Sequence, residues 1–205
     1  MSRIPLPTLE SMNPQQRAVY DNIVNGPRGR LVGPLRAVLH NPDLAERWQR
    51  LGEILRFDTV LPPKLNELAI LVTARRWNSQ IEWHIHSEAA LKAGLGAEII
   101  ESLKKSSPPV FSDESEALVY EYARQLHTRG TVDAALYQKA VQAWGPVGVV
   151  ELTAVIGYYT MVSMTLNVHE IPMPDDAPPP LDVPEAADAP VLTTLPAALL
   201  REPAA

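Results

Sequence analysis

Three residues in the middle of the chain have the types and spacing of a small acid/base site. Glu82 and His86 are four residues apart, so in a helix their side chains lie on one face. A carboxylate beside an imidazole can hold one tautomer and raise its basicity. Burial would shift a second carboxylate, Glu67, toward its neutral acid form and separate its role from that of Glu82. Such groups could remove a proton next to a carbonyl, or protonate the carbanion left when CO2 is lost.

The same residues also have structural interpretations, which the sequence leaves open. Ser79 followed three residues later by Glu82 fits a capping box. Glu82 and His86 can be a helix-surface pair, and Glu67 can favour the positive start of its helix. A metal site is a third interpretation, because His84 lies between Glu82 and His86. His84 and His86 would point about 200 degrees apart around one helix, so we expect no metal ligands here.

Other residues near this stretch could hold a substrate. Arg75 or Arg76 could bind a carboxylate bidentately, and the helical periodicity favours Arg75, which lies closer to the face with the predicted second acid. Ser79, Trp83 and His40 are further candidate substrate contacts. His40 stands next to a predicted helix cap, so it also fits an ordinary turn residue.

Two helices joined by a short polar break must position these groups. Pro62-Pro63 fits the first turn of a helix. Apolar residues then recur at three- and four-residue spacings, namely Leu65, Leu68, Ala69, Leu71 and Val72. Asn78-Ser79 interrupts the pattern, and Gly94 is a natural C-cap for the second helix. The sequence therefore predicts a helical hairpin on which the polar groups could converge.

The segments ELAIL, EWxxH and ALKAGL of this hairpin resemble the carboxymuconolactone decarboxylase and alkylhydroperoxidase-D-like (AhpD-like) superfamily. Its redox-active members carry a Glu, a C-x-x-C pair that starts twelve residues later, and a His four residues after the second Cys. Counting from Glu67 puts the two thiol positions at Ser79 and Glu82, and the His at His86. Both outer residues match, and neither thiol is present. The resemblance implies an all-α helical bundle of the AhpD-like type that is oligomeric.

The resemblance also implies candidate activities. In the decarboxylases of this family the substrate is a carboxylated unsaturated lactone, and no cofactor is used. We therefore expect a cofactor-free lyase or isomerase on a small carboxylated or lactone substrate, with His86 as acid or base, Glu82 orienting it and Glu67 as second proton carrier. One alternative is a catalytically silent ligand-binding or assembly protein, with Trp77 and Trp83 filling the pocket. A hydroperoxidase is disfavoured, because the chain has no cysteine.

Composition limits the partners and the compartment. The chain has 205 residues, of which 46% are hydrophobic, and this suits one domain with a real core. The formal charge is -6 with Lys and Arg scattered, so we expect neither nucleic acid nor membrane as a partner. No run reaches the roughly twenty apolar residues of a membrane span, and the N-terminal residues lack an apolar signal core. We expect a cytoplasmic protein with a small-molecule substrate, and the resemblance implies a dimer, trimer or hexamer.

The chain divides by composition into three parts. Residues 1–12 fit an extended lead-in, residues 13–171 the helical domain, and residues 172–205 a Pro- and Ala-rich arm. The arm either packs on a partner subunit or is disordered. Within the domain, residues 26–34 form a loop dense in Gly and Pro, which is either a connection or the rim of a pocket.

Breakers and caps predict the remaining helices. Asn13-Pro14 and Asn41-Pro42 each fit an N-cap followed by a first helical residue. Ser112 fits the N-cap of a long helix that ends at Gly130, and the next helix should stop at Gly145-Pro146. The last helix, from there to about residue 171, is apolar almost all round, which favours the buried centre of the bundle or of a subunit interface.

Overall fold

The computed structural model describes residues 2–183 and 192, and this part of the chain is all-helical. The helices are, in chain order, α1 (Pro14–Asn25), α2 (Leu35–Val38), α3 (Pro42–Phe57), α4 (Pro63–Arg76), α5 (Gln80–Lys92), α6 (Ala97–Lys104), α7 (Glu114–Arg129), α8 (Ala134–Val168) and the short 3-10 helix η1 (Pro174–Asp176). The described residues contain no strand. The predicted all-α class is confirmed.

Asparagine-proline pairs start two of the helices, as predicted. The Asn13 side chain accepts a hydrogen bond from the Gln16 backbone N–H at 2.9 Å, and the Gln16 side chain accepts one from the Asn13 N–H at 3.0 Å. Asn41 caps α3 in the same way, accepting from the Leu44 N–H at 3.1 Å. These caps fix where α1 and α3 begin.

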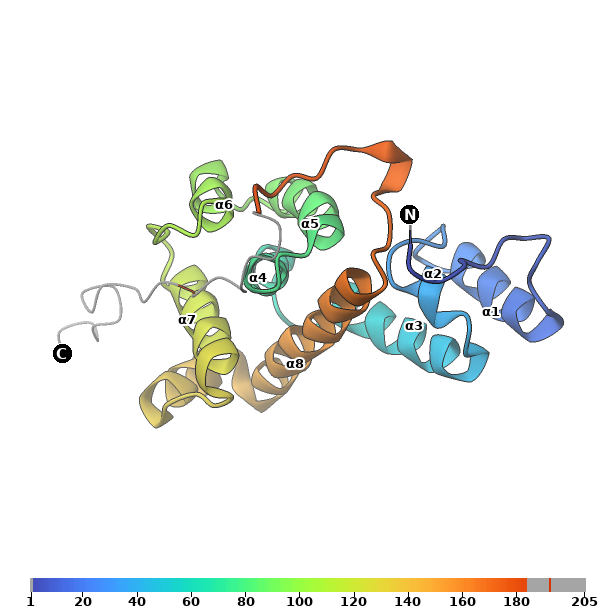
Figure 1. The fold of residues 1–205 in the computed structure, drawn as a ribbon. Helices are drawn as coiled ribbons and strands as arrows, with labels where there is room; N and C mark the ends of the chain where they lie inside the picture. The colour runs from blue at the N-terminus through green and yellow to red at the C-terminus, as the bar shows by residue number, and fades with distance from the viewer. Residues whose placement is uncertain (1, 184–191, 193–205) are drawn as a thin grey trace, which may run out of the picture.

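The helix α4 lies at the centre of the bundle, with α5, α7 and α8 packed around it (Figure 1). Every residue from Leu65 to Ala74 in α4 is buried. Each large aliphatic side chain buried in this way stabilises the fold by about 1.5–3 kcal/mol. The helices α1 to α3 gather at one end of the molecule, where α3 contacts α8. The hairpin of α4 and α5 is therefore held from several sides.

The start of α7 differs from the prediction by one residue, whereas the predicted break at Gly145-Pro146 is confirmed. The N-cap of α7 is Asp113 rather than Ser112, because the Asp113 side chain accepts from the Ser115 N–H. The chain kinks at Gly145, with φ 66° and ψ 178°, and continues as the second segment of α8. Pro146 fits the first position of that segment, where its missing N–H loses no helical bond. Two helical segments therefore meet at Gly145-Pro146, as predicted, and α8 is the range that spans both.

One face of α8 is apolar and exposed, so within one chain the last helix is not the buried centre of the bundle. The other predicted alternative, a subunit interface, stays a prediction. Five side chains of this α8 apolar face are more than a third exposed: Val147, Val150, Met161, Met164 and Val168. Ala154 and Gly157 continue the same line at three- and four-residue spacings. The opposite face packs on α4, α7 and α3. α4 takes the central position, because it is covered all round.

By length and composition alone, α8 could cross a membrane, contrary to the expectation from the sequence. Its most apolar 18-residue stretch has a mean hydropathy of 1.4, and half of that stretch is buried inside the fold. The core helix of a soluble protein has the same character. The cytoplasmic location expected from composition stays a prediction.

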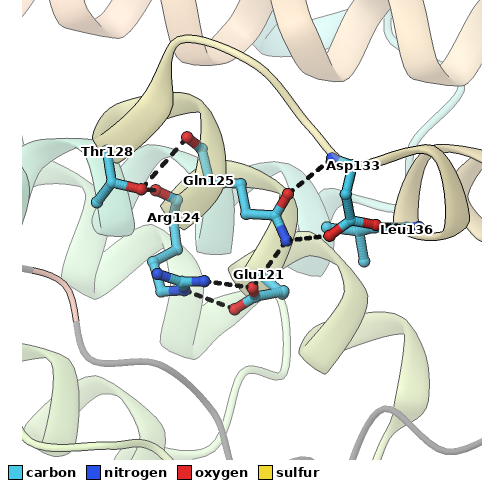
Figure 2. A network of polar contacts seen from close by, with 6 residues as sticks. All are labelled: Glu121, Arg124, Gln125, Thr128, Asp133 and Leu136. Atoms are coloured by element: carbon cyan, nitrogen blue, oxygen red, sulfur yellow. Dashed lines mark hydrogen bonds and ion pairs between the residues drawn. The ribbon is translucent and has the colours of Figure 1, made fainter.

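A polar network joins the end of α7 to the start of α8 (Figure 2). Glu121 accepts hydrogen bonds from Arg124 Nε at 2.7 Å and Nη2 at 2.5 Å, and from Gln125 Nε2 at 3.0 Å. Gln125 also bonds to the side chain and backbone of Asp133. Asp133 caps α8 by accepting from the Leu136 N–H at 2.9 Å. The turn between the two helices is thus fixed by hydrogen bonds.

Replacing the cap residue Asp133 with alanine should lower the free energy of unfolding by about 1–2 kcal/mol, because the α8 cap is lost. Chemical denaturation followed by circular dichroism measures this. Asp21→Ala is the control, since Asp21 is half exposed and forms only a surface pair with Arg17, worth less than about 1 kcal/mol. Equal losses in the two variants would contradict the role given to the cap.

The first part of the C-terminal arm lies on its own chain. The Gln80 side chain at the start of α5 donates to the Leu181 carbonyl at 2.9 Å and accepts from the Leu181 N–H at 2.8 Å. Leu181 and Leu192 are both buried. The prediction that the arm packs on a partner subunit needs correcting up to residue 183; residues 184–191 and 193–205 lie outside the described part.

Candidate active site

The structure brings Glu67, Glu82 and His86 together between α4 and α5. His86 Nδ1 lies 2.6 Å from Glu67 Oε2, and His86 Nε2 lies 3.3 Å from Glu82 Oε2. All three residues are buried, with His86 only 2% exposed. One carboxylate comes from each helix, so the hairpin places the imidazole between two acids.

Both ring nitrogens of His86 face a carboxylate, and this sets its charge. Burial alone disfavours the charged imidazole and is the largest single influence on its pKa. The negative charge of Glu67 and the hydrogen bonds to Glu67 and Glu82 together outweigh burial and raise the pKa of His86 to about 9. At neutral pH the imidazole is therefore charged, with Nδ1–H donating to Glu67 and Nε2 forming an ion pair with Glu82.

A small cavity lies on one side of Glu82 and His86. Its volume is about 30 Å³, and it is lined by Arg28, Val32, Gly33, Pro34, Leu35, Arg56, Glu82, Ile85, His86, Tyr158, Tyr159 and Val162. That volume holds roughly two water molecules. Glu82 and His86 reach the cavity, whereas Glu67 does not line it. Glu67, the closer partner of His86, thus lies on the side of the imidazole away from the cavity. Glu82 lies on the cavity side.

The loop of residues 26–34 forms part of the cavity wall, which agrees with its interpretation as a pocket rim. Gly33 has a φ of 58°, a conformation that suits glycine, and a Cβ there would lie 4.0 Å from Glu82 Oε1. Pro34 follows it in the cavity wall. The loop therefore brings its backbone close to the Glu82 carboxylate.

The capping-box interpretation of Ser79 and Glu82 needs correcting. Ser79 does stand at the N-cap position of α5, but its side chain makes no capping hydrogen bond. Its Oγ is buried and has no partner among the described residues. The Glu82 carboxylate turns to His86 instead of returning to the helix start. The surface-pair interpretation also fails, because both Glu82 and His86 are buried.

Four residues predicted as substrate contacts do not line the cavity: Arg75, Ser79, Trp83 and His40. Arg75 donates to the Lys104 carbonyl at 3.0 Å and to Asn78, so neighbouring backbone and side chain occupy it. His40 is exposed and bonds to the Pro5 carbonyl at 2.7 Å. Trp83 is 2% exposed and belongs to the core. The alternative in which tryptophans fill the pocket also loses its basis, because neither Trp77 nor Trp83 reaches the cavity.

The third interpretation, a metal held by the two histidines of α5, does not fit their directions. His84 is exposed whereas His86 is buried, as their two-residue spacing on a helix requires. One ion could not reach both side chains.

Sequence reasoning missed the residues that reach the cavity from other elements. Arg28 comes from the loop after α1, Arg56 from the last turn of α3, and Tyr158 and Tyr159 from α8. The Tyr159 ring meets the His86 ring edge to face, with centroids 5.0 Å apart. Burial, followed by the charge of Glu82, raises the pKa of Tyr159 well above its ordinary value. Two adjacent tyrosines in an otherwise apolar helix were the available signal.

Comparison with known proteins agrees with the fold. Residues 42–120 match the model of the Carboxymuconolactone decarboxylase family. The fold resembles the alkylhydroperoxidase AhpD core of an uncharacterized peroxidase-related protein from Ralstonia eutropha JMP134, with a TM-score of 0.69, 13% identity, and coverage of 85% of this chain and 93% of that one. No curated protein sequence matches the chain.

The fold also resembles the debrominase Bmp8, whose structure was solved in complex with 2,3,4-tribromopyrrole. The TM-score is 0.67 at 14% identity, over 86% of this chain and 95% of Bmp8. At such identities the two structural likenesses establish the fold, and chemistry has to be argued from the site itself.

Proposed function

We propose that this chain, whose residues 42–120 match the Carboxymuconolactone decarboxylase family model and whose fold resembles that of an AhpD core, is a cofactor-free acid/base enzyme. It acts as a lyase or isomerase on a small lactone or carboxylated substrate. The observation that carries this proposal is the buried His86 at the wall of a cavity, hydrogen-bonded to Glu67 through Nδ1 and ion-paired with Glu82 through Nε2.

The geometry supports a different division of roles from the one expected from the sequence. Glu67 is the closer acid and lies away from the cavity, so it orients His86 and stabilises its charge. Glu82 faces the cavity and stands where the family register puts the second thiol. We therefore propose Glu82 as the group that exchanges a proton with substrate, and His86 as the imidazolium that resupplies it.

The proposed chemistry is a proton transfer at carbon. The Glu82 carboxylate removes a proton from the carbon next to a carbonyl, and the C–H electron pair moves onto the carbonyl oxygen. Returning the proton to another carbon gives an isomerase. In a lyase, loss of CO2 leaves an electron pair in the conjugated system, and the Glu82–His86 pair supplies the proton that neutralises it.

The substrate is proposed to be small and ring-shaped. The fold relative Bmp8 was solved with a substituted pyrrole. The cavity of about 30 Å³ must widen to admit even a ring of that size, which flexible side chains such as Ile85 at its wall allow. Thiol peroxidase chemistry is excluded from the proposal, because Glu82 cannot form a sulfenic acid as a thiolate does.

The experiment that tests the function is a substrate screen in D2O followed by proton NMR. The panel contains unsaturated γ-lactones with and without a carboxyl group, together with β-keto acids. At least one compound should exchange its acidic C–H for deuterium or lose CO2 faster with the protein than without it. If a compound binds the cavity and none of the panel reacts, the enzyme proposal fails.

The second candidate function is a catalytically silent ligand-binding protein, because a buried Glu–His–Glu group beside a cavity can hold a polar ligand without turning it over. A binding protein would take up a panel compound with no deuterium exchange, whereas the enzyme would do both. The same NMR samples therefore distinguish the two functions.

We also propose that the chain self-associates through the α8 apolar face. Its members recur at three- and four-residue spacings along the helix, which is the pattern of a seam between two helices. The face has no charge along this line, so it can meet the same face of a second copy without like-charge contacts.

Replacing Met161 and Met164 together by glutamate should turn the oligomer into a monomer, because like charges would then face each other across the seam. Light scattering after size-exclusion chromatography gives the mass. Gln142→Glu, an exposed position earlier in the same helix, is the matched control and should keep the wild-type mass. A monomeric wild type, or a double variant of unchanged mass, would count against this interface.

A further inference from the structure

Two arginines line the same cavity as Glu82 and His86. Arg28 lies in the loop between α1 and α2, and Arg56 lies in the last turn of α3. Neither forms an ion pair with a residue that the structure describes. Two positively charged side chains in the cavity that contains Glu82 and His86 favour the binding of a negatively charged ligand.

Of the two arginines, Arg28 gives the stronger evidence for a bound anion. Its Nε and Nη2 atoms are buried and form no hydrogen bond of ordinary distance and angle with a described residue, and the Tyr158 hydroxyl is the polar group that lies beside them. Buried polar groups in folded proteins nearly always have a partner. Nη2 lies with the Tyr158 hydroxyl over Gly52, where a Cβ atom would meet these two atoms at 2.4 and 2.0 Å. Gly52 therefore leaves the space that the guanidinium occupies.

The two unpartnered atoms form one edge of the guanidinium, and this edge fits a carboxylate. Nε and Nη2 can donate two parallel hydrogen bonds to the two oxygens of one carboxylate. The chain uses the same edge elsewhere, because Arg124 binds Glu121 through Nε and Nη2 (Figure 2). Arg28 lines the cavity, and no carboxylate among the described residues pairs with this edge.

A second hollow lies next to the cavity and extends the cationic lining toward the surface. Its volume is about 280 Å³, and it shares Val32, Gly33 and Ile85 with the inner cavity. Its charged lining residues are Arg30, Arg36 and Asp175, so two positive charges face one negative charge. The whole chain has a formal charge of -6, so this concentration of arginines is local, and it would attract an anion toward the inner cavity.

We infer that Arg28 and Arg56 form a carboxylate-binding subsite, which holds an organic anion with its reacting carbon at Glu82, and that the outer hollow is its entrance. This inference rests on the proposed function and assigns its substrate recognition to residues outside the α4–α5 hairpin. Arg28 contacts the carboxylate through its free edge, and Arg56 adds the second positive charge. Arg36 and Arg30 act earlier, on the approach.

The test compares benzoate with benzamide, which have nearly the same shape and differ in charge. Isothermal titration calorimetry is done with the wild type, Arg28→Gln and Arg50→Gln. Benzoate should bind the wild type more tightly than benzamide does. Arg28→Gln should weaken benzoate binding roughly tenfold or more, because a bidentate charged contact is lost. Arg50→Gln should leave it unchanged, since Arg50 is 70% exposed on α3 and pairs with Glu46.

Further variants separate this inference from the proposed function. Glu82→Gln should still bind benzoate, because the subsite does not need the proton carrier. Arg28→Lys keeps the positive charge but cannot donate two parallel hydrogen bonds from a planar guanidinium, so it should bind benzoate with intermediate affinity. If thermal unfolding shows that Arg28→Gln does not fold, Arg56→Gln decides in its place. Benzoate binding that is equal in wild type and variant, or no binding to the wild type at millimolar concentration, would overturn the subsite and leave the proton-transfer proposal standing.

Discussion

Replacing Glu82 with glutamine is expected to lower the turnover of any substrate found in the screen by roughly 10²–10⁴-fold, the usual contribution of a positioned acid or base. Glutamine keeps the volume and one acceptor oxygen but cannot take up a proton. Glu82 is 4% exposed and lies 3.3 Å from His86 Nε2. The fold should therefore survive while the proton transfer stops.

The matched control for this variant is Glu88→Gln on the same helix. Glu88 is exposed and pairs with Lys92 at 2.7 Å, so its amide variant should keep full activity. Both variants are compared by initial rates and by their circular dichroism spectra. Loss of a proton carrier should lower turnover at least about 100-fold. A Glu82→Gln protein that retains more than about a tenth of wild-type turnover would therefore contradict the role of Glu82 in the mechanism.

The free energy of unfolding is expected to fall by about 3 kcal/mol between pH 6.5 and 9, through His86 alone. The folded pKa of about 9 lies above the ordinary value of 6.5. A raised pKa means that the folded state binds the proton more tightly than the unfolded state does. The stabilisation is complete below pH 6.5 and is lost as pH rises through 9.

Denaturant unfolding at intervals across this range measures the loss. Glu67→Gln is the informative comparison, because without the Glu67 charge the pKa of His86 should be lower and the slope smaller. His127 does not interfere: burial, with the nearby charge of Arg76, lowers its pKa to about 4, so it is neutral in both states over most of this window. A wild type whose stability stays flat from pH 6.5 to 9 would mean that His86 is not held in its charged form.

The sequence could predict those parts of the fold and site that depend on local chemistry. Asn13-Pro14 and Asn41-Pro42 mark helix starts, because cap and first-turn preferences act within a few residues. Glu82 and His86 share a face because the helical period requires it. The relation of Glu67 to His86 needed the hairpin as well, and the family resemblance supplied its register.

Other features depend on packing that one segment does not determine. Helical periodicity put Arg75 near the face of Glu67, yet Lys104 and Asn78 occupy its guanidinium. Arg28 and Arg56 reach the cavity from other parts of the chain, which no spacing in the hairpin could indicate. The final helix is apolar all round in sequence, and only the packing of α4 shows which of the two helices is central.

The residues at the two positions where redox-active family members carry thiols determine which chemistry this site can perform. At the two family thiol positions the chain has Ser79, buried and without a partner, and Glu82, which bonds to His86. The family Glu and His are therefore kept at Glu67 and His86, whereas Glu82 puts a carboxylate in the place of the second thiol. This combination suits proton transfer at carbon and gives no route to peroxide reduction through a thiol.

Nitrogen-15 NMR of the His86 ring between pH 5 and 10 tests the central claim most directly, because it reads the protons on Nδ1 and Nε2 without any substrate. The account predicts that both nitrogens are protonated at pH 7, that the ring titrates near pH 9, and that Glu67→Gln lowers this value. A ring that is already neutral at pH 7 in the wild type, with one bare nitrogen, would contradict the proposal that His86 is a charged proton donor held between two carboxylates.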